Sequence, residues 1–230
     1  MLLALDTATR TLSLALHDGA HVYTEYTWHS DSHHTVELVP AIQAALAQAR
    51  LRARDLTHLA VAQGPGSFNG LRVGFSVAQS LALALNVPLI AIPTLDIVAA
   101  AQPPLTPRLI ALAQAGRGRL CGAAYDWSAG QGWQAASQAR IEAPEALLAA
   151  FSAPHTPTRV AGEVDSAVRT AIHVLNTASA RQLELASPAW ALRRAAFLAE
   201  QAWARFRSGE QGDPLRAVPF YLHQPGLAHP

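Results

Sequence analysis

The sequence predicts an α/β protein of two lobes, each with three antiparallel strands followed by a helix, a strand and a second helix. Three observations support this prediction. Short segments that alternate apolar and polar residues open the chain, and stretches with helical periodicity follow them. The proline-rich segment QPPLTP at 102–107 then interrupts the pattern. Beyond it the same order of elements begins again, as expected for an internal duplication.

The first lobe is assigned to residues 1–104. Its first strand is a short apolar run, and the next two strands flank the turn signal Asp18-Gly19. Pro40 is expected to kink the first helix or to delay its start. In chain order, the predicted elements are strands at 2–5, 11–16 and 22–28, a helix over 32–50, a strand at 59–62, a helix over 69–85, a strand at 87–92 and a helix over 95–101.

The second, smaller lobe is assigned to residues 105–187, and residues 188–230 to a C-terminal helix and tail that pack back between the lobes. The final helix is predicted over 188–207, and the tail contains the extended segment AVPFYL before a disordered end. The predicted elements of the second lobe are strands at 109–113, 120–127 and 133–141, separated by turns at 116–118 and 130–132, then a helix over 144–151, a strand at 159–161 and a helix around 165–171.

Two lobes of this order describe the ribonuclease H-like fold of the actin, sugar-kinase and Hsp70 group, also called the ASKHA fold. Composition limits what such a chain can do. A net charge of +1 is too small for independent electrostatic capture of nucleic acid. All 17 basic residues are arginine, so the lysine of a GxxxxGK[ST] phosphate loop and a lysine Schiff base are both excluded.

The same composition indicates a soluble, cytoplasmic protein without a membrane partner. The single cysteine, Cys121, allows no intrachain disulfide, and it is expected to be a packed strand residue rather than a nucleophile. The N-terminal segment has no basic region and reaches Asp6 after a short apolar run, so no signal peptide is expected. Asn86, Pro88 and Pro93 interrupt the apolar residues that follow 81, before a membrane span is reached.

A glycine-rich turn in the segment LAVAQGPGSFNGLRVG, at 59–74, connects a predicted strand to a predicted helix. Ser67 or Asn69 can cap that helix. Free N–H groups at a helix N-terminus form a cradle for anions. The residues alone leave open whether the chain uses this cradle for phosphate or only as a turn that sets the direction of the helix.

Four motifs resemble the TsaB (YeaZ) family of bacterial tRNA threonylcarbamoyladenosine synthesis: LALDTATRTLSLAL, GPGSFNGLRVG, IPTLDIVA and PFYL. The resemblance is nearly continuous over residues 1–102. It implies a non-catalytic scaffold or activating subunit of the complex that transfers a threonylcarbamoyl group to adenosine 37 of tRNA (t6A modification). It also implies binding to the catalytic subunit TsaD through the first-lobe helices, a homodimer in isolation, the ATPase TsaE as a further partner, and tRNA reached only through the complex.

The resemblance also bears on the site residues. In TsaD a His-x-x-x-His pair binds the metal after the strand that matches 89–92, where this chain has TLDIVA with one carboxylate. No catalytic residue, metal site or intrinsic cofactor is therefore expected, although ATP or ADP is allowed at the partner junction. Asp6 and Thr7 stand where enzymes of this fold hold metal-bound phosphate, and are the candidate nucleotide-binding residues. The segments 114–118 and 162–164 depart from the family pattern, which weakens that assignment.

Small and apolar residues surround more than one face of the two long first-lobe helices, more than a single sheet can cover. We therefore expect a partner interface there, with Val77 on the exposed face. The candidate interface residues are Val36, Val39, Gln43, Ser67, Phe68, Asn69, Arg72, Val73, Val77 and Ser80.

Two other functions remain open at this point: an ATP-dependent phosphotransferase of the ASKHA fold, and a glycoprotease-like metallopeptidase of the M22 type. The spacing of His29 and His33 resembles a metal motif, but the segment is expected to be a polar loop. Ser67 lies in Gly-Ser-Phe rather than in G-x-S-x-G, which argues against a serine nucleophile.

Overall fold

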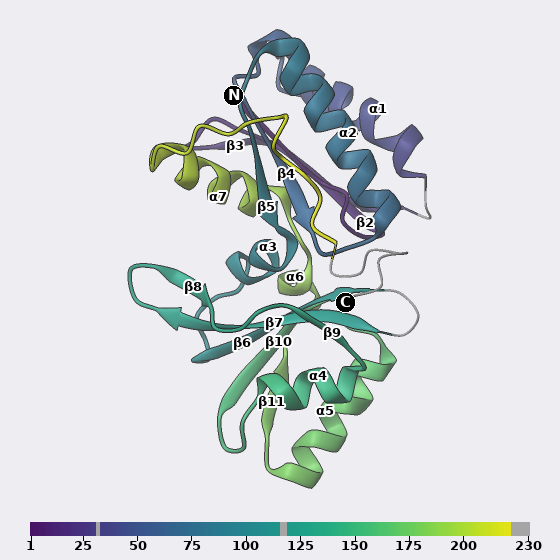
Figure 1. The fold of residues 1–230 in the computed structure, drawn as a ribbon, viewed down its shortest axis with the longest axis vertical. Coiled ribbons are helices and arrows are strands. Elements are labelled where there is room, and N and C mark those ends of the chain that lie inside the picture. The colour runs from purple at the N-terminus through teal and green to yellow at the C-terminus, as the bar shows by residue number, and fades with distance from the viewer. Residues whose placement is uncertain (31–32, 116–118, 222–230) are drawn as a thin grey trace, which may run out of the picture.

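The structure, a computed structural model, describes residues 1–30, 33–115 and 119–221, and it consists of two α/β lobes (Figure 1). The predicted turn at 116–118 and the end of the tail lie outside the described residues. In the described residues, no helix is long and apolar enough to cross a membrane.

The first lobe is a five-stranded sheet in the order β3-β2-β1-β4-β5. Strands β1, β2 and β3 are antiparallel, whereas β4 and β5 run parallel to β1. The predicted element order is confirmed, and Pro40 lies inside the first helix. The elements are β1 (Leu2–Asp6), β2 (Thr11–His17), β3 (Val22–His29), α1 (His34–Gln48), β4 (His58–Gly64), α2 (Phe68–Leu85), β5 (Leu89–Pro93) and α3 (Thr94–Ala100), with a short 3-10 turn at Ala53–Asp55.

Helices cover both faces of this first sheet, which explains why β1 is apolar without alternation. Leu3 and Leu5 point to the core beneath α1 and α2, whereas Leu2 and Ala4 point to the opposite core beneath α7 (Ala195–Arg207). All four side chains are fully buried. A strand that is buried on both faces has no polar face to display.

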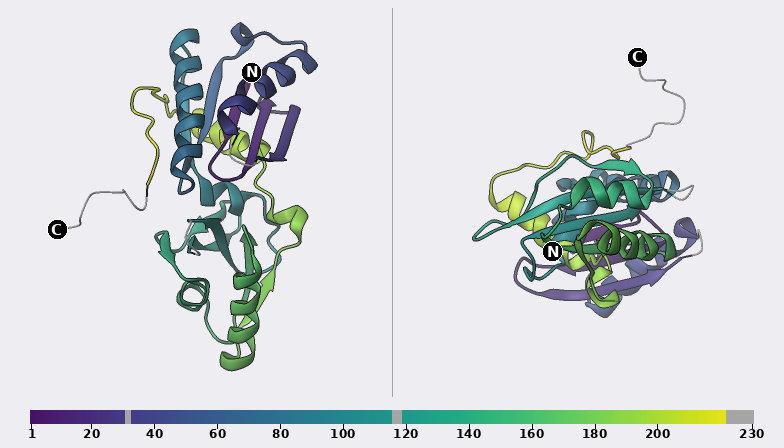
Figure 2. Two further views of the ribbon diagram at one scale, coloured as in Figure 1. Left: turned by 90° about the vertical axis from the view of Figure 1, so that its right-hand side faces the viewer. Right: turned by 90° about the horizontal axis from the view of Figure 1, so that it is seen from below.

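The second lobe is a six-stranded sheet in the order β11-β10-β6-β7-β8, with β9 beside β7. Helices α4 and α5 cover the side of this sheet that faces away from the first lobe (Figure 2). The elements are β6 (Arg108–Gln114), β7 (Leu120–Ser128), β8 (Gly132–Ala135), β9 (Arg140–Glu142), α4 (Pro144–Phe151), β10 (Pro157–Gly162), α5 (Ser166–Ser179) and β11 (Gln182–Leu185).

Two predictions for the second lobe are wrong in detail, and one strand was missed. The strand expected over 133–141 is two strands, because the Ser137 hydroxyl accepts the Ala124 N–H at 2.9 Å and so replaces a backbone partner. The helix expected to end near 171 continues to Ser179, where Ala180 adopts a left-handed conformation. Strand β11 was not predicted, because its four residues give too short a pattern.

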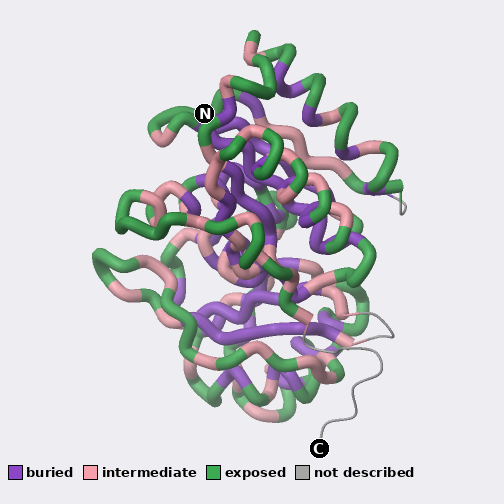
Figure 3. The backbone as a smooth tube through the Cα atoms, turned by 45° about the horizontal axis from the view of Figure 1, so that its top comes forward, coloured by how far each residue is buried: buried purple, intermediate pink, exposed green. Residues whose placement is uncertain are grey.

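The helix predicted over 188–207 is also wrong as one element. It is divided into α6 (Pro188–Ala191) and α7 by residues 192–194, whose Leu192 and Arg194 are extended. Helix α7 returns the chain to the first lobe and packs against its sheet. The tail then passes beside α2 with a turn at 214–216, and Gln79 donates to the carbonyls of Pro214 and Ala217 at 2.9 Å each. Buried residues lie in the interior of the molecule, and exposed residues lie on its outer turns (Figure 3).

Candidate functional site

The glycine turn between β4 and α2 seats the helix tightly on the loop that follows β1. Ser67 caps α2, because its hydroxyl accepts the Gly70 N–H at 3.3 Å, as predicted for one of the two candidates. A Cβ atom at Gly66 would lie 2.2 Å from the Ala8 carbonyl oxygen. The Ser67 N–H also donates to Ala8, at 2.6 Å. Two of the N–H groups of the expected anion cradle are thus already bonded within the chain.

The two candidate nucleotide-binding residues are bonded in the same way. Asp6 is fully buried, and its Oδ1 accepts the Ala8 N–H at 2.9 Å. Its Oδ2 accepts from Nε of Arg193, also at 2.9 Å. Thr7 donates its hydroxyl to the Gly70 carbonyl at 2.7 Å. The described hydrogen bonds of Asp6 and Thr7 therefore join the end of β1 to α2 and to Arg193.

Arg193 is the residue that the sequence reasoning missed. It stands between α6 and α7 with 2% of its side chain exposed, and it pairs with carboxylates of both lobes. Its Nη1 donates to Oε1 of Glu163 at 3.3 Å, and its Nη2 donates to the Thr9 hydroxyl at 2.6 Å. Glu163 in turn accepts the Gln114 N–H at 2.7 Å. The available signal was the pair Arg193–Arg194, which interrupts the apolar residues on both sides of it in the first half of the predicted helix.

The electrostatics of this cluster favour a charged arginine. Burial alone lowers the pKa of Arg193, but the negative charges and hydrogen bonds of Asp6 and Glu163 outweigh it, so the net shift is upward. A buried arginine that bonds to two carboxylates satisfies groups which would be costly to bury separately. The cluster joins the end of β1 to the turn after β10.

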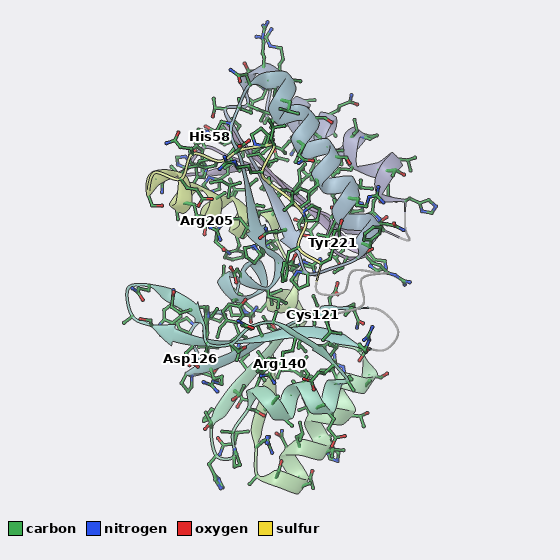
Figure 4. All side chains as sticks on the ribbon, viewed as in Figure 1. His58, Cys121, Asp126, Arg140, Arg205 and Tyr221 are labelled. Atoms are coloured by element: carbon green, nitrogen blue, oxygen red, sulfur yellow. The ribbon has the colours of Figure 1, made fainter. Side chains whose placement is uncertain are left out.

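A cavity of about 900 Å³ lies between the lobes beside this cluster. Thr9, Arg10 and the Pro65–Phe68 turn line one side, and Gln114 and Cys121 line the other. Cys121 on β7 and Tyr221 at the described end of the tail lie near the junction between the lobes (Figure 4). Burial raises the pKa of the Cys121 thiol to about 12, which leaves it unreactive as a nucleophile at neutral pH.

The residues considered as metal ligands lie in different parts of the first lobe. Asp96 on α3, the one carboxylate of the segment TLDIVA, accepts the Tyr125 hydroxyl at 2.7 Å. Of the pair His29 and His33, His29 ends β3 and lines the cavity, and the His33 N–H donates to the Ser30 hydroxyl at 3.2 Å. The adjacent His34 bonds to the Thr9 carbonyl at 2.9 Å. Within residues 1–30, 33–115 and 119–221, no three histidine, cysteine, aspartate or glutamate side chains are grouped so as to hold a metal ion.

The candidate interface residues lie on α1 and α2, which cover one face of the first sheet (Figure 1). Val36 is 66% exposed, and three further large apolar side chains, Val39, Phe68 and Leu83, are each at least 42% exposed. Val36 and Val39 belong to the first turns of α1, Phe68 begins α2 and Leu83 lies near its end; we call these four residues the apolar docking face. The candidates Gln43, Ser67, Asn69, Arg72 and Ser80 are also exposed.

Two candidates are placed differently. Val73 and Val77 are only partly exposed and pack against the core below α2, so Val77, expected on the exposed face, lies at its edge. Both valines lie next to the buried residues of α2, such as Phe75 and Ala78, and contact the same core. At the other end of α2, Phe68 stacks on Tyr221 with ring centroids 5.0 Å apart, and the Arg72 guanidinium lies 5.2 Å from the Phe68 centroid.

The sequence is similar to those of known protein families. The model of the family described as "TsaD: tRNA N6-adenosine threonylcarbamoyltransferase" matches residues 27–209. The "tRNA threonylcarbamoyladenosine biosynthesis protein TsaB" of Bacillus subtilis is 36% identical over 99 residues, which is 43% of this chain and 43% of that protein. The chain thus spans less than half the length of this curated relative.

Solved structures match over nearly the whole chain. A crystal structure described as an uncharacterized protein with similarity to peptidase YEAZ from Pseudomonas aeruginosa is 25% identical, with a TM-score of 0.78, over 96% of this chain and 99% of that one. YeaZ from Pseudomonas aeruginosa shares the fold, with a TM-score of 0.74 and 23% identity over the same shares. The chain therefore belongs to the TsaD family of tRNA N6-adenosine threonylcarbamoyltransferases, and within it to the TsaB (YeaZ) group.

Proposed function

We propose that this chain is a non-catalytic subunit of the complex that makes threonylcarbamoyladenosine in tRNA, and that it binds the catalytic subunit TsaD through α1 and α2. The observation that carries the proposal is the apolar docking face, where Val36, Val39 and Leu83 project from two neighbouring helices. In this proposal they are parts of one apolar surface that the partner covers, as is typical of interaction sites. The Bacillus subtilis relative is named a biosynthesis protein rather than a transferase, which supports a non-catalytic role.

The inter-lobe cleft gives further support for a non-catalytic role. Phosphoryl transfer requires carboxylates that hold metal ions and a clamp on the phosphates. In this chain the buried Asp6 is bonded to Arg193 instead, and Thr7 is bonded to α2. We infer that the cleft performs no nucleotide chemistry alone, and that any ATP or ADP binds at the junction with the partner.

The same face serves, in this proposal, for a homodimer when the partner is missing. A stable interface buries about 1,200–2,000 Å² in total, which is compatible with two helices of this length lying side by side. TsaE and tRNA would join through the complex rather than through this chain. The proposed place of action is the cytoplasm.

The decisive experiment substitutes one exposed valine with arginine. Val36→Arg is expected to weaken association with TsaD by roughly tenfold or more, because a desolvated charge would face an apolar partner. Val36 is suitable because it is 66% exposed, so its folding contribution is small. Val77→Arg is a poorer choice, since Val77 packs against the core.

Val174→Arg provides the matched control, because Val174 is 37% exposed on α5 of the second lobe. Size-exclusion chromatography with TsaD and a tRNA modification assay with and without this chain supply the readouts. Equal binding by the Val36→Arg and Val174→Arg proteins would contradict the docking assignment. Nucleotide turnover by the isolated chain would instead favour a phosphotransferase.

A further inference from the structure

Four oxygen atoms from both lobes converge on one guanidinium group. Asp6 contributes Oδ2 at 2.9 Å from Nε, and Glu163 contributes Oε1 at 3.3 Å from Nη1. Thr9 contributes its hydroxyl at 2.6 Å and Thr11 its backbone carbonyl at 3.2 Å, both from Nη2. Carboxylate, hydroxyl and carbonyl oxygens are the atoms that hard cations bind in proteins.

The position of this oxygen cluster is also that of a ligand site. Asp6 ends β1, next to the parallel strand β4, and Glu163 follows β10 of the second lobe. In open α/β sheets, ligands bind outside the carboxyl ends of the parallel strands. In this chain the Arg193 side chain occupies that place. It comes from a distant segment, 187 residues after Asp6.

The local backbone explains how the arginine reaches the cluster. The residues that flank it, Leu192 and Arg194, are both extended, with φ of −73° and −119°. In extended backbone, consecutive side chains point to opposite sides. Arg193 accordingly turns inward, whereas Arg194 turns outward to Glu25 with 47% of its side chain exposed. The break between α6 and α7 thus delivers one arginine to the cleft and leaves its neighbour at the surface.

The two carboxylates favour a cation at this point, although each also has neutral donors: Asp6 accepts the Ala8 N–H, and Glu163 accepts the Thr9 hydroxyl. Asp6 is fully buried, and the Glu163 side chain is 20% exposed. Other charged groups near the cleft are Arg10, which is exposed, and Asp165, which accepts the Gln114 amide at 3.3 Å. Without Arg193, two carboxylates and two neutral oxygens would face one another with no positive charge among them.

We propose that Arg193 is an internal cation, which takes the place of a bound cation in the inter-lobe cleft and holds the two lobes in a fixed relative orientation. This role does not depend on the docking of TsaD. The proposal predicts that the Arg193→Ala protein binds a cation from solution, in the space that Arg193 leaves and through the oxygen atoms that remain. A guanidinium ion matches the lost group in shape, and Ca²⁺ matches the oxygen ligands.

The test measures the melting temperature of the full chain. Arg193→Ala is expected to lower Tm by roughly 10 °C, because it leaves a buried carboxylate unpaired. Guanidinium at about 10 mM, which is far below denaturing concentrations, should restore at least half of that loss, and Ca²⁺ should restore part of it. Arg194→Ala is the matched control, with a change of about 2 °C or less and no response to either cation.

Small-angle scattering adds a readout of lobe orientation. The radius of gyration of the Arg193→Ala protein should increase and then return to the wild-type value with guanidinium. A Tm loss that neither cation relieves, or an unchanged radius of gyration, would overturn the proposal. Should Arg193→Ala fail to fold, added guanidinium should increase its refolding yield. An unchanged yield would overturn the proposal. The Arg193→Met/Asp6→Asn/Glu163→Gln protein, which lacks all three charges of the cluster, should refold independently of added cation.

Discussion

Thr7 and Gly74 are in such close contact that a Cβ atom at Gly74 would lie 2.3 Å from the Thr7 hydroxyl oxygen. The same hydroxyl donates to the Gly70 carbonyl one turn earlier in α2. Gly70 itself approaches the backbone of Thr7, with a Cβ there expected 2.3 Å from the Thr7 carbonyl oxygen. The glycines of GLRVG therefore allow α2 to lie directly on the loop after β1.

Gly74→Ala should destabilise the protein by about 1–3 kcal/mol, because the added methyl group overlaps a fixed hydroxyl. This cost exceeds the gain of roughly 1 kcal/mol that alanine brings to a helix interior. Urea unfolding measures the difference. Ser76→Ala, at an exposed position of the same helix, should change stability by no more than about 0.5 kcal/mol.

A double-mutant cycle with Thr7→Ala identifies the contact responsible. Removing the hydroxyl relieves the overlap, so the double variant should be more stable than the sum of the single changes predicts. Strict additivity would show that the methyl group at Gly74 meets some other obstacle.

The hydrogen bond between Tyr125 and Asp96 joins β7 to α3 at 2.7 Å. Burial raises the pKa of Asp96, while the Tyr125 hydrogen bond and the charge of Arg205 oppose that increase. Tyr125→Phe should therefore raise this pKa further. At pH 7 the variant is expected to lose about 1.5–3 kcal/mol, because an ionised carboxylate loses its donor in a largely buried place.

The pH dependence of that loss has a definite sign. An acid whose pKa is raised on folding binds its proton more tightly in the folded state, so its contribution to stability declines as pH rises above the ordinary value of 3.8. The Tyr125→Phe protein should thus differ less from wild type at pH 4 than at pH 7. Urea unfolding at both values, with Asp96→Asn as the control background, measures this. An equal loss at the two pH values would show that the charge of Asp96 is not involved.

Local patterns in the sequence were enough to predict the first lobe. Its strands and helices bury faces that periodicity reveals, and its glycine turn carries its own signal. The exposure of Val77 could not be predicted correctly, because periodicity gives the direction of a side chain on a helix but not which neighbouring segments cover the edge of its exposed face. There Val77 joins the core beneath α2, which also includes Ala217 of the tail.

The inter-lobe cluster could not be predicted in this way. Arg193, Asp6 and Glu163 are far apart in the chain, and each alone is an ordinary charged residue. The same limit explains the split of the strand predicted over 133–141, where the Ser137 side chain bonds to another strand. Pairings of this kind depend on the three-dimensional arrangement of the lobes, which no short stretch encodes.

His58 should titrate below its ordinary pKa. It packs between Trp203 and Phe206 of α7, with ring centroids 4.7 and 4.5 Å away, on the first lobe (Figure 4). Burial lowers its pKa from 6.5, and the positive N-terminus lowers it further. NMR titration of the imidazole signals tests this directly. Phe206→Ala exposes the ring and should move the pKa back toward 6.5, whereas an unchanged value would exclude burial as the cause.

The consequence for stability follows from the sign of the shift. A histidine whose pKa is lowered on folding resists protonation, so the unfolded state binds protons first as pH falls below 6.5. Folding therefore loses stability across that range. His58→Phe should lose less Tm than wild type between pH 7.5 and pH 5, because the phenyl ring retains the contacts and does not titrate.

Cys121 should resist thiol reagents as long as the protein is folded. It is 1% exposed on β7, and burial raises its pKa to about 12, so at pH 8 roughly one thiol in ten thousand is ionised. It is the single cysteine of the chain, so the labelled fraction is a direct count. The native protein should react with a disulfide reagent at less than about 1% of the rate of a free cysteine, and fully in denaturant. Because Cys121 lines the inter-lobe cavity, rapid labelling of the native protein would mean that this cavity opens to solvent more often than its packing allows.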